Sequence, residues 1–135
     1  MIHEHQIRVR YAETDQMRCV YYGNYAQYFE VGRVEFLRSR GLSYKDLEAE
    51  GVMMPVVELR IKYKRPATYD DLLTIRSQVA ALTDKRVVFT QEVFSESDKL
   101  LTEGTVELAF IDSRTMRPIN CPPHLKEVFN QLGNA

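Results

Sequence analysis

The feature that most restricts the fold of this chain is a change of hydrophobic period near residue 55. From there onward apolar and polar residues alternate, which is the pattern of β-strands with one buried face. The first of these strands is expected to turn four apolar side chains inward, namely Val57, Leu59, Ile61 and Tyr63. Its other face is expected to point to solvent and carries Glu58, Arg60, Lys62 and Lys64.

Three further strands follow with the same alternation. Their inward positions are predicted to be Leu73, Ile75, Ser77 and Val79, then Val87, Phe89, Gln91 and Val93, then Val106, Leu108 and Phe110. Val88 and Phe94 make the second face of one strand apolar as well. Because an open sheet edge or an apolar outer face is rarely left bare, part of the sheet is predicted to be covered, most simply by a second copy of the chain.

The N-terminal half combines a strand with a long helix. Residues 5–12 alternate, and Ile7, Val9 and Tyr11 are predicted to share the buried face. Asn24 is the expected N-cap of a helix that ends near Gly41, with an apolar stripe of Tyr25, Tyr28, Phe29, Gly32, Phe36 and Leu37. Gly32 is expected to let this helix press closely against a strand.

Two more helices complete the predicted order. Ser43, with Asp46 three residues later, indicates the N-cap of a short helix that stops at Gly51. A terminal amphipathic helix is predicted from the spacing of Leu125, Val128, Phe129 and Leu132. The order strand, long helix, four strands, helix predicts one α+β domain over residues 1–135, in which an antiparallel sheet curls around one long buried helix.

The composition argues against several kinds of function. Lys and Arg total 18 against 19 Asp and Glu, a net charge of −1, so no global positive field draws the chain to nucleic acid or anionic lipid. No signal peptide, no membrane insertion and a cytoplasmic location are expected, because the N-terminus lacks a basic start with an apolar run and no 18 apolar residues occur together. Cys19 and Cys121 are interpreted as separate thiols.

The segment Tyr11-Ala12-Glu13-Thr14-Asp15 carries the strongest chemical signal, because it sets a short carboxylate just upstream of the expected helix start. The first N–H groups of a helix lack intrahelical partners and act with the peptide dipoles like about half a positive charge. A carbonyl group placed there is polarised while a nearby carboxylate attacks it or activates water. Asp15 is therefore a candidate for acyl-transfer chemistry, although a loop aspartate can equally cap a turn.

Other residues near the same helix compete with Asp15. Glu13 is more simply explained by a solvated or salt-bridged role. Cys19 would be a weak nucleophile, because all three histidines lie near the termini and an unassisted thiol is mostly protonated at neutral pH. Glu30 is a weaker candidate for a second acid, and with Arg33 at i, i+3 it can equally form a helix-surface ion pair.

Taken together, these segments resemble the hotdog-fold 4-hydroxybenzoyl-CoA thioesterase family, in particular the acyl-CoA thioesterases of the Tol-Pal operon type. The resemblance spans nearly the whole chain and includes Val20-Tyr21-Tyr22-Gly23-Asn24-Tyr25 besides the Asp15 segment. Its other parts are residues 41–44, 55–57, 63–66 and 69–71, with Glu30, Arg33, Glu35 and Arg117-Pro118. In this order and spacing the set is specific, whereas each part alone is weak.

The resemblance implies hydrolysis of a fatty or aromatic acyl-CoA thioester. Asp15 matches the family's catalytic aspartate, and the N–H of Tyr22 matches the donor to the thioester carbonyl. Tyr25 is expected to line the substrate pocket, although a tyrosine at helical spacing is more often plain core. Lys85 and Arg86 match basic positions that hold the nucleotide phosphates of coenzyme A, or else form a solvated turn.

The family builds its site at a dimer interface, often within a tetramer, so a homodimer or homotetramer is expected, with no metal and no bound cofactor. Two positions depart from the family pattern. Many members have His where Tyr22 stands and a glycine at or next to Arg18. If Arg18 neutralises Asp15, the chain is instead a non-catalytic module that binds acyl-CoA or an acyl carrier protein. A hotdog dehydratase would want a catalytic histidine, which the chain does not place near the site.

Overall fold

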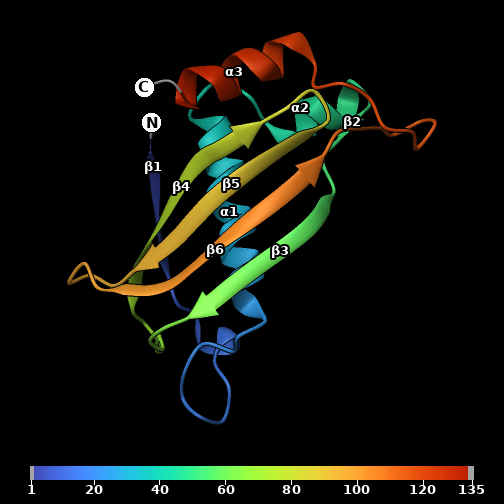
Figure 1. Cartoon of the computed structure of the whole chain (residues 1–135). Helices are drawn as coiled ribbons and strands as arrows, with labels where there is room; N and C mark the ends of the chain where they lie inside the picture. Colours follow the sequence, from blue (N-terminus) through green and yellow to red (C-terminus); the bar gives the residue numbers. More distant parts are fainter. Residues whose placement is uncertain (1, 134–135) are drawn as a thin grey trace.

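The structure, a computed structural model, describes residues 2–133, with side chains through residue 130. Five antiparallel strands form one sheet in the order β1-β4-β5-β6-β3 (Figure 1). They are β1 (His3–Arg8), β3 (Val56–Tyr63), β4 (Leu72–Leu82), β5 (Arg86–Phe94) and β6 (Leu100–Ala109). A separate two-stranded sheet pairs β2 (Val52–Met53) with β7 (Ile111–Asp112).

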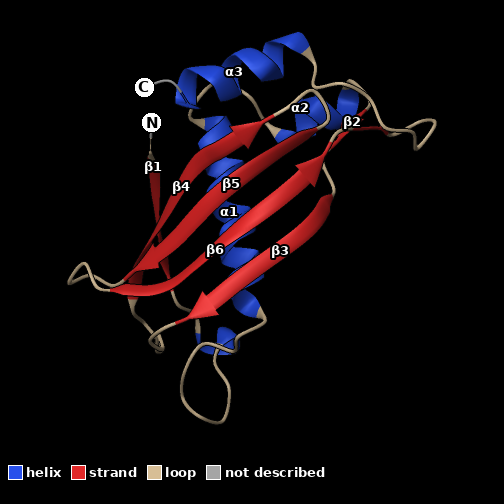
Figure 2. Ribbon diagram, in the orientation of Figure 1, coloured by secondary structure: helices blue, strands red, loops and turns tan. Residues whose placement is uncertain are grey.

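The large sheet curls around the long helix α1 (Asn24–Arg38), which Figure 2 shows behind the strands. Two further helices, α2 (Tyr44–Ala49) and α3 (Pro123–Gly133), lie at one end of the sheet. The loop that follows β1 and leads to α1 lies at the opposite end (Figure 1). Five antiparallel strands around one long helix, with a helix at the C-terminus, confirm the predicted hotdog fold.

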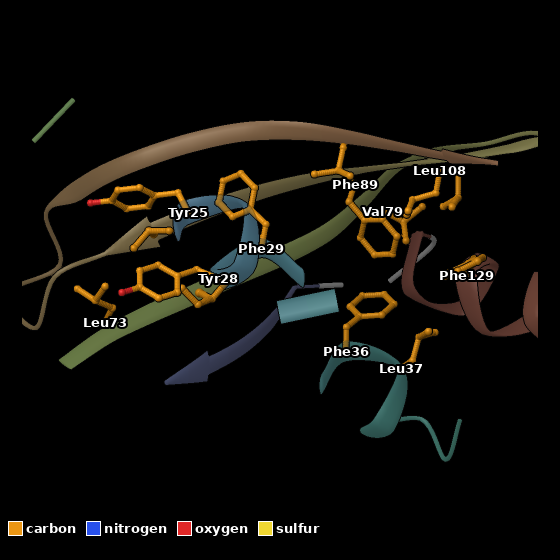
Figure 3. Packing of buried hydrophobic residues seen from close by; sticks show 14 of the residues in the cluster. Tyr25, Tyr28, Phe29, Phe36, Leu37, Leu73, Val79, Phe89, Leu108 and Phe129 are labelled. Carbon is orange, nitrogen blue, oxygen red and sulfur yellow. The ribbon is translucent and has the colours of Figure 1, made fainter. Parts of the chain in front are cut away.

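Helix α1 fills the inside of the sheet with its predicted apolar stripe. Its large side chains are each at most 3% exposed (Figure 3), and they are Tyr25, Tyr28, Phe29, Phe36 and Leu37. Phe36 meets Phe89 of β5 edge to face, with 5.3 Å between ring centroids. Phe129 of α3 packs against the Phe89 ring, with 5.8 Å between centroids. The helix therefore joins the sheet and α3 into one core.

Gly32 is a point of close approach between α1 and the sheet. A Cβ atom at this position would lie 2.7 Å from Cγ2 of Ile75 and 2.9 Å from Nε2 of Gln91. The space is used by the buried amide of Gln91, which donates to the Phe29 carbonyl at 2.8 Å and to Oγ of Ser77 at 3.0 Å. The predicted close packing at Gly32 is confirmed, and it lets a polar side chain bridge helix and sheet.

The inward positions predicted for the last three strands are all buried. Val88 and Phe94, which were predicted to make the second face of β5 apolar, are only half-buried. The Arg76 guanidinium lies 4.1 Å from the centre of the Phe94 ring and covers it, so the chain itself shields part of this apolar surface.

The chain leaves the sheet earlier than the sequence pattern predicts. β1 ends at Arg8, and Tyr11 is 76% exposed within the short 3₁₀ turn η1 (Tyr11–Glu13), so the strand predicted over residues 5–12 is too long. The Glu13 carboxylate closes this turn, because it accepts the Arg10 backbone N–H at 2.8 Å and pairs with the Arg10 guanidinium at 3.2 Å. These local bonds replace the ladder bonds of a longer strand.

The start of α1 also differs in detail from the prediction. Asn24 is the first helical residue, and Gly23 precedes it in helical conformation at the cap position. The Asn24 side chain does not cap the helix but donates to the Glu13 carbonyl at 2.8 Å. It therefore ties the helix start to the loop that precedes it.

Strand β3 departs most from the prediction. Val57, Leu59 and Tyr63 were expected to face inward, yet they are 48%, 41% and 50% exposed, and only Ile61 of this row packs against the core. The reason is position, because β3 is the last strand of the sheet and pairs only with β6. In the single chain the expected burial of these three residues is wrong.

The remaining helices follow the prediction. The Ser43 side chain caps α2 by accepting the Asp46 N–H at 3.1 Å, and Leu125 and Phe129 of α3 are fully buried. Leu132, the last residue of the predicted α3 stripe, lies outside the residues whose side chains are described. Cys19 and Cys121 are free thiols, as expected. Within residues 2–133, no helix is long and apolar enough to cross a membrane.

Candidate active site

The loop between β1 and α1 folds back on itself and presents Asp15. Thr14 and Val20 form an antiparallel bridge, and within it the Asp15 N–H donates to the Cys19 carbonyl at 3.0 Å. The Arg18 N–H returns to the Asp15 carbonyl at 2.9 Å, with Arg18 at a φ of +67°. This tight turn fixes the backbone on both sides of the Asp15 side chain.

The Asp15 carboxylate is only partly engaged by its own loop. Its Oδ1 atom accepts the Met17 N–H at 2.9 Å, and the Cys19 thiol approaches the same atom at 4.0 Å. The other oxygen, Oδ2, accepts no hydrogen bond from any described residue. Asp15 thus serves the loop as a turn residue through Oδ1, and within the described residues its Oδ2 atom has no hydrogen-bond donor.

The start of α1 leaves a backbone donor in the same region. The Asn24 N–H donates to the Tyr21 carbonyl at 2.9 Å, which directs that carbonyl toward the body of the helix. In a trans peptide the N–H points opposite to the C=O, so the Tyr22 N–H points away from the helix. Among the described residues it has no acceptor, as expected for a helix N-terminus.

A pocket of about 260 Å³ brings these groups together. Three predicted site residues, Asp15, Tyr22 and Tyr25, all line it. The rest of its wall consists of Met17, Cys19, Val20, Tyr63, Lys64, Arg65 and Pro66. The loop, the helix start and the end of β3 therefore converge on one cavity, although they are far apart in the sequence.

Tyrosines form one side of the pocket. The ring of Tyr25 packs edge to face on that of Tyr63, with 5.5 Å between centroids, and Tyr22 contacts Tyr63 at 6.2 Å. Burial raises the pKa of Tyr25, so its phenol stays neutral at physiological pH. Tyr25 is both core and pocket wall, so the two interpretations of this residue are compatible.

Arg18 does not neutralise Asp15. Its side chain is exposed, and no ion pair among the described residues joins its guanidinium to the Asp15 carboxylate. At this departure from the family pattern, Arg18 therefore forms no ion pair with Asp15 within the described residues.

The competing acids have other roles. Glu13 pairs with Arg10 and accepts the Tyr28 hydroxyl at 3.0 Å, so its salt-bridged role is confirmed. Glu30 is exposed and does not line the pocket. Arg33 does not form the expected surface pair with Glu30 but is buried and donates to Oε1 of Gln91 at 2.9 Å.

Lys85 and Arg86 lie at the other end of the sheet, at the turn between β4 and β5 (Figure 1). Arg86 pairs there with Glu107 at 3.4 Å. Neither residue lines the Asp15 pocket of the same chain. Lys64 and Arg65, by contrast, do line it.

Sequence reasoning did not single out Tyr63 or Met17 as site residues. The available signal for Tyr63 as a site residue was its place in segment 63–66, which carries part of the family resemblance. The alternation of apolar residues along β3 instead suggested that Tyr63 belongs to the core, because the sequence does not reveal that β3 is an edge strand.

A hotdog sheet that brings a carboxylate and the start of a helix into one pocket is the arrangement that the sequence leads us to expect of a thioester hydrolase. Comparison with known proteins supports this class, since the model of the thioesterase-like superfamily matches residues 9–129. The acyl-CoA thioester hydrolase YbgC of Escherichia coli O6:H1 is 32% identical over 125 residues, which cover 93% of each chain. The chain belongs to the thioesterase-like superfamily.

Solved structures agree with the sequence comparison. A DHNA-CoA thioesterase from Staphylococcus aureus has a TM-score of 0.92 at 34% identity, over 96% of this chain and 89% of that one. The protein TT1821 from Thermus thermophilus has a TM-score of 0.93 at 35% identity, over 100% of both chains. The fold is thus shared over essentially the full length.

Proposed function

We propose that the protein hydrolyses an acyl-CoA thioester to a free acid and coenzyme A. The observation that carries this proposal is the shared pocket, which both Asp15 and Tyr22 line. Among the described residues, neither the Oδ2 atom of Asp15 nor the N–H of Tyr22 has a hydrogen-bond partner. The names of the relatives support the substrate class, because YbgC is an acyl-CoA thioester hydrolase. The acyl group is fatty or aromatic, and the tyrosine wall suits either.

In the proposed reaction the thioester oxygen accepts the Tyr22 N–H, which stabilises the negative charge that develops on it. A donor of this kind is typically worth about 3 kcal/mol in the transition state. Asp15 then acts in one of two ways. Either Oδ2 attacks the acyl carbon, the C–S bond breaks to release coenzyme A, and water hydrolyses the mixed anhydride. Or Asp15 takes a proton from the water that attacks the acyl carbon, after which the C–S bond breaks and coenzyme A leaves.

We further propose that the working form is a homo-oligomer in which β3 is covered by a second chain. Val57, Leu59 and Tyr63 form an exposed apolar row on a strand whose outer edge is unpaired. Such an edge readily accepts another strand. A second copy would also offer a route by which Lys85 and Arg86 approach a substrate in the Asp15 pocket of the partner, since neither residue lines that pocket in its own chain.

Replacement of Asp15 by Asn tests the catalytic proposal. The amide keeps the shape of the side chain but removes its charge, so turnover of a panel of acyl-CoA esters should fall by about a hundredfold or more. Equal turnover by the two proteins would refute the role of Asp15. Stoichiometric retention of unhydrolysed acyl-CoA by the native protein would instead favour a binding module for acyl-CoA or acyl carrier protein.

Replacement of Leu59 by Glu tests the covering of β3. A carboxylate in the apolar row should shift the protein to a monomer in light scattering and lower its turnover, because burial of a charge opposes association. Lys62→Glu is the matched control, since Lys62 is exposed on the other face of the same strand. An unchanged oligomer in Leu59→Glu would contradict the proposed interface.

A further inference from the structure

Tyr63, the last residue of β3, is joined to the start of α1 by a hydrogen bond. Its hydroxyl donates to the Tyr22 carbonyl at 3.2 Å, across 41 positions of sequence. Tyr22 is 62% exposed, and its ring packs against that of the adjacent Tyr21 with 4.6 Å between centroids. The bond from Tyr63 adds a restraint from a distant strand on the residue whose N–H is proposed to polarise the substrate.

The bond acts on a specific peptide plane. The Tyr22 carbonyl also accepts the Tyr25 N–H, but at the longer distance of 3.3 Å. The same peptide unit contains the N–H of Gly23, which points in the direction opposite to the Tyr22 carbonyl. Because Tyr63 and Tyr25 draw the carbonyl toward β3 and the helix, the Gly23 N–H points back from the helix start, and it has no acceptor among the described residues.

Two ring contacts fix the position of the Tyr63 hydroxyl. The Tyr63 ring lies edge to face with Tyr22 at an interplanar angle of 78° and with Tyr25 at 68°. Burial and the neighbouring Tyr22 phenol raise the pKa of Tyr63, so the hydroxyl keeps the proton that it donates. Tyr63 also lines the pocket, which places the restraint at the site itself.

We propose that Tyr63 is a positioning residue, which holds the first turn of α1 so that the N–H groups of Tyr22 and Gly23 together bind the oxygen of the thioester in the transition state. The proposal rests on the proposed function, because it assigns Tyr63 and Gly23 to the same reaction. It adds a second backbone donor and a side chain from another strand, neither of which was predicted from the sequence.

Replacement of Tyr63 by Phe tests this assignment, because it keeps both ring contacts and removes only the hydroxyl. The loss of one restraining hydrogen bond should lower kcat about five- to tenfold while KM stays within about twofold. Tyr69→Phe is the matched control. Tyr69 is also half-exposed and in edge contact with a tyrosine, but it does not line the pocket.

The outcomes separate this inference from the proposed function. If Asp15→Asn abolishes turnover and Tyr63→Phe retains native kcat, the positioning role is wrong and the catalytic proposal stands. A rise in KM at native kcat also overturns it, because Tyr63 would then bind the substrate uniformly in ground and transition states. Equal losses in Tyr63→Phe and Tyr69→Phe overturn it as well, since they would reflect a general effect on the fold.

Discussion

The Oδ1 atom of Asp15 accepts the backbone N–H of Met17 at 2.9 Å. The proposed catalytic carboxylate is thus also part of the turn that presents it. A substitution at this position changes two things at once, the charge in the pocket and the shape of the loop. Only a replacement that preserves the acceptor can separate them.

Asp15→Ala and Asp15→Asn should therefore differ in stability. Asn retains an oxygen that accepts the Met17 N–H, whereas Ala leaves this donor unpaired and should lower the free energy of unfolding by about 1 kcal/mol. Urea unfolding of both variants measures the difference. Identical stabilities would show that the Asp15–Met17 bond contributes nothing to the loop.

Cys19 should prove dispensable for turnover. It lines the pocket, and its thiol lies 4.0 Å from Oδ1 of Asp15, yet no histidine is present in the pocket wall to activate it. Cys19→Ser should therefore keep turnover within about threefold of native. The substitution is discriminating, because serine without a base is a far weaker nucleophile than a thiol and could not replace a catalytic Cys19. A loss comparable with that of Asp15→Asn would make Cys19 the nucleophile instead.

Two basic pairs, Lys85 with Arg86 and Lys64 with Arg65, should respond differently to the nucleotide of coenzyme A. Replacement of Lys85 and Arg86 by Ala should raise KM for a CoA ester more than for a truncated thioester that lacks the nucleotide, because only the former offers phosphates. The same double substitution at Lys64 and Arg65 is the comparison. If only the second pair discriminates between the substrates, the phosphates are held beside the Asp15 pocket of the same chain.

Gly32→Ala should destabilise the protein although alanine favours helices. The added Cβ would lie 2.7 Å from Cγ2 of Ile75. Overpacking of this kind costs about 1 to 3 kcal/mol, against a helix-propensity gain of about 1 kcal/mol, so a net loss of up to about 2 kcal/mol is expected. Gln27→Ala, at an exposed position of the same helix, is the control and should have little effect.

His3 should make stability fall in mild acid. Burial, and next the nearby His5, lower the pKa of His3 from its ordinary value of 6.5, and its ring packs on Phe36. Because the native state favours the neutral ring, its contribution is present above pH 6.5 and is lost as pH falls through the lowered pKa. Urea unfolding between about pH 7.5 and 5.5 should show a smaller decline in His3→Gln than in the native protein.

The sequence correctly predicted the buried faces of those helices and strands in which apolar residues recur with a clear helical or strand period. The stripe of α1 and the inward rows of β4 and β5 are buried as expected, because these elements touch the core along their whole length. Gly32 was also predicted correctly, since a glycine inside a helix calls for a close neighbour. The convergence of Asp15, Tyr22 and Tyr25 on one pocket followed from the family resemblance rather than from any period.

The sequence did not indicate where each element lies within the folded sheet. Alternation in β3 is the same whether its apolar face meets a helix of the same chain or another molecule, so the exposure of Val57 and Leu59 was not foreseen. Charge type likewise did not reveal that Lys85 lies at the far end of the sheet from Asp15. The role of Tyr63 depends on a contact across 41 positions, which no local pattern encodes.

Tyr63 ends an edge strand and at the same time holds the helix start at the pocket. A peptide or antibody fragment that displaced the second copy from β3 would therefore also disturb the pocket wall at Tyr63. Inhibitors of this protein need not imitate a thioester, because a ligand that occupied the edge of the sheet would lower turnover as well.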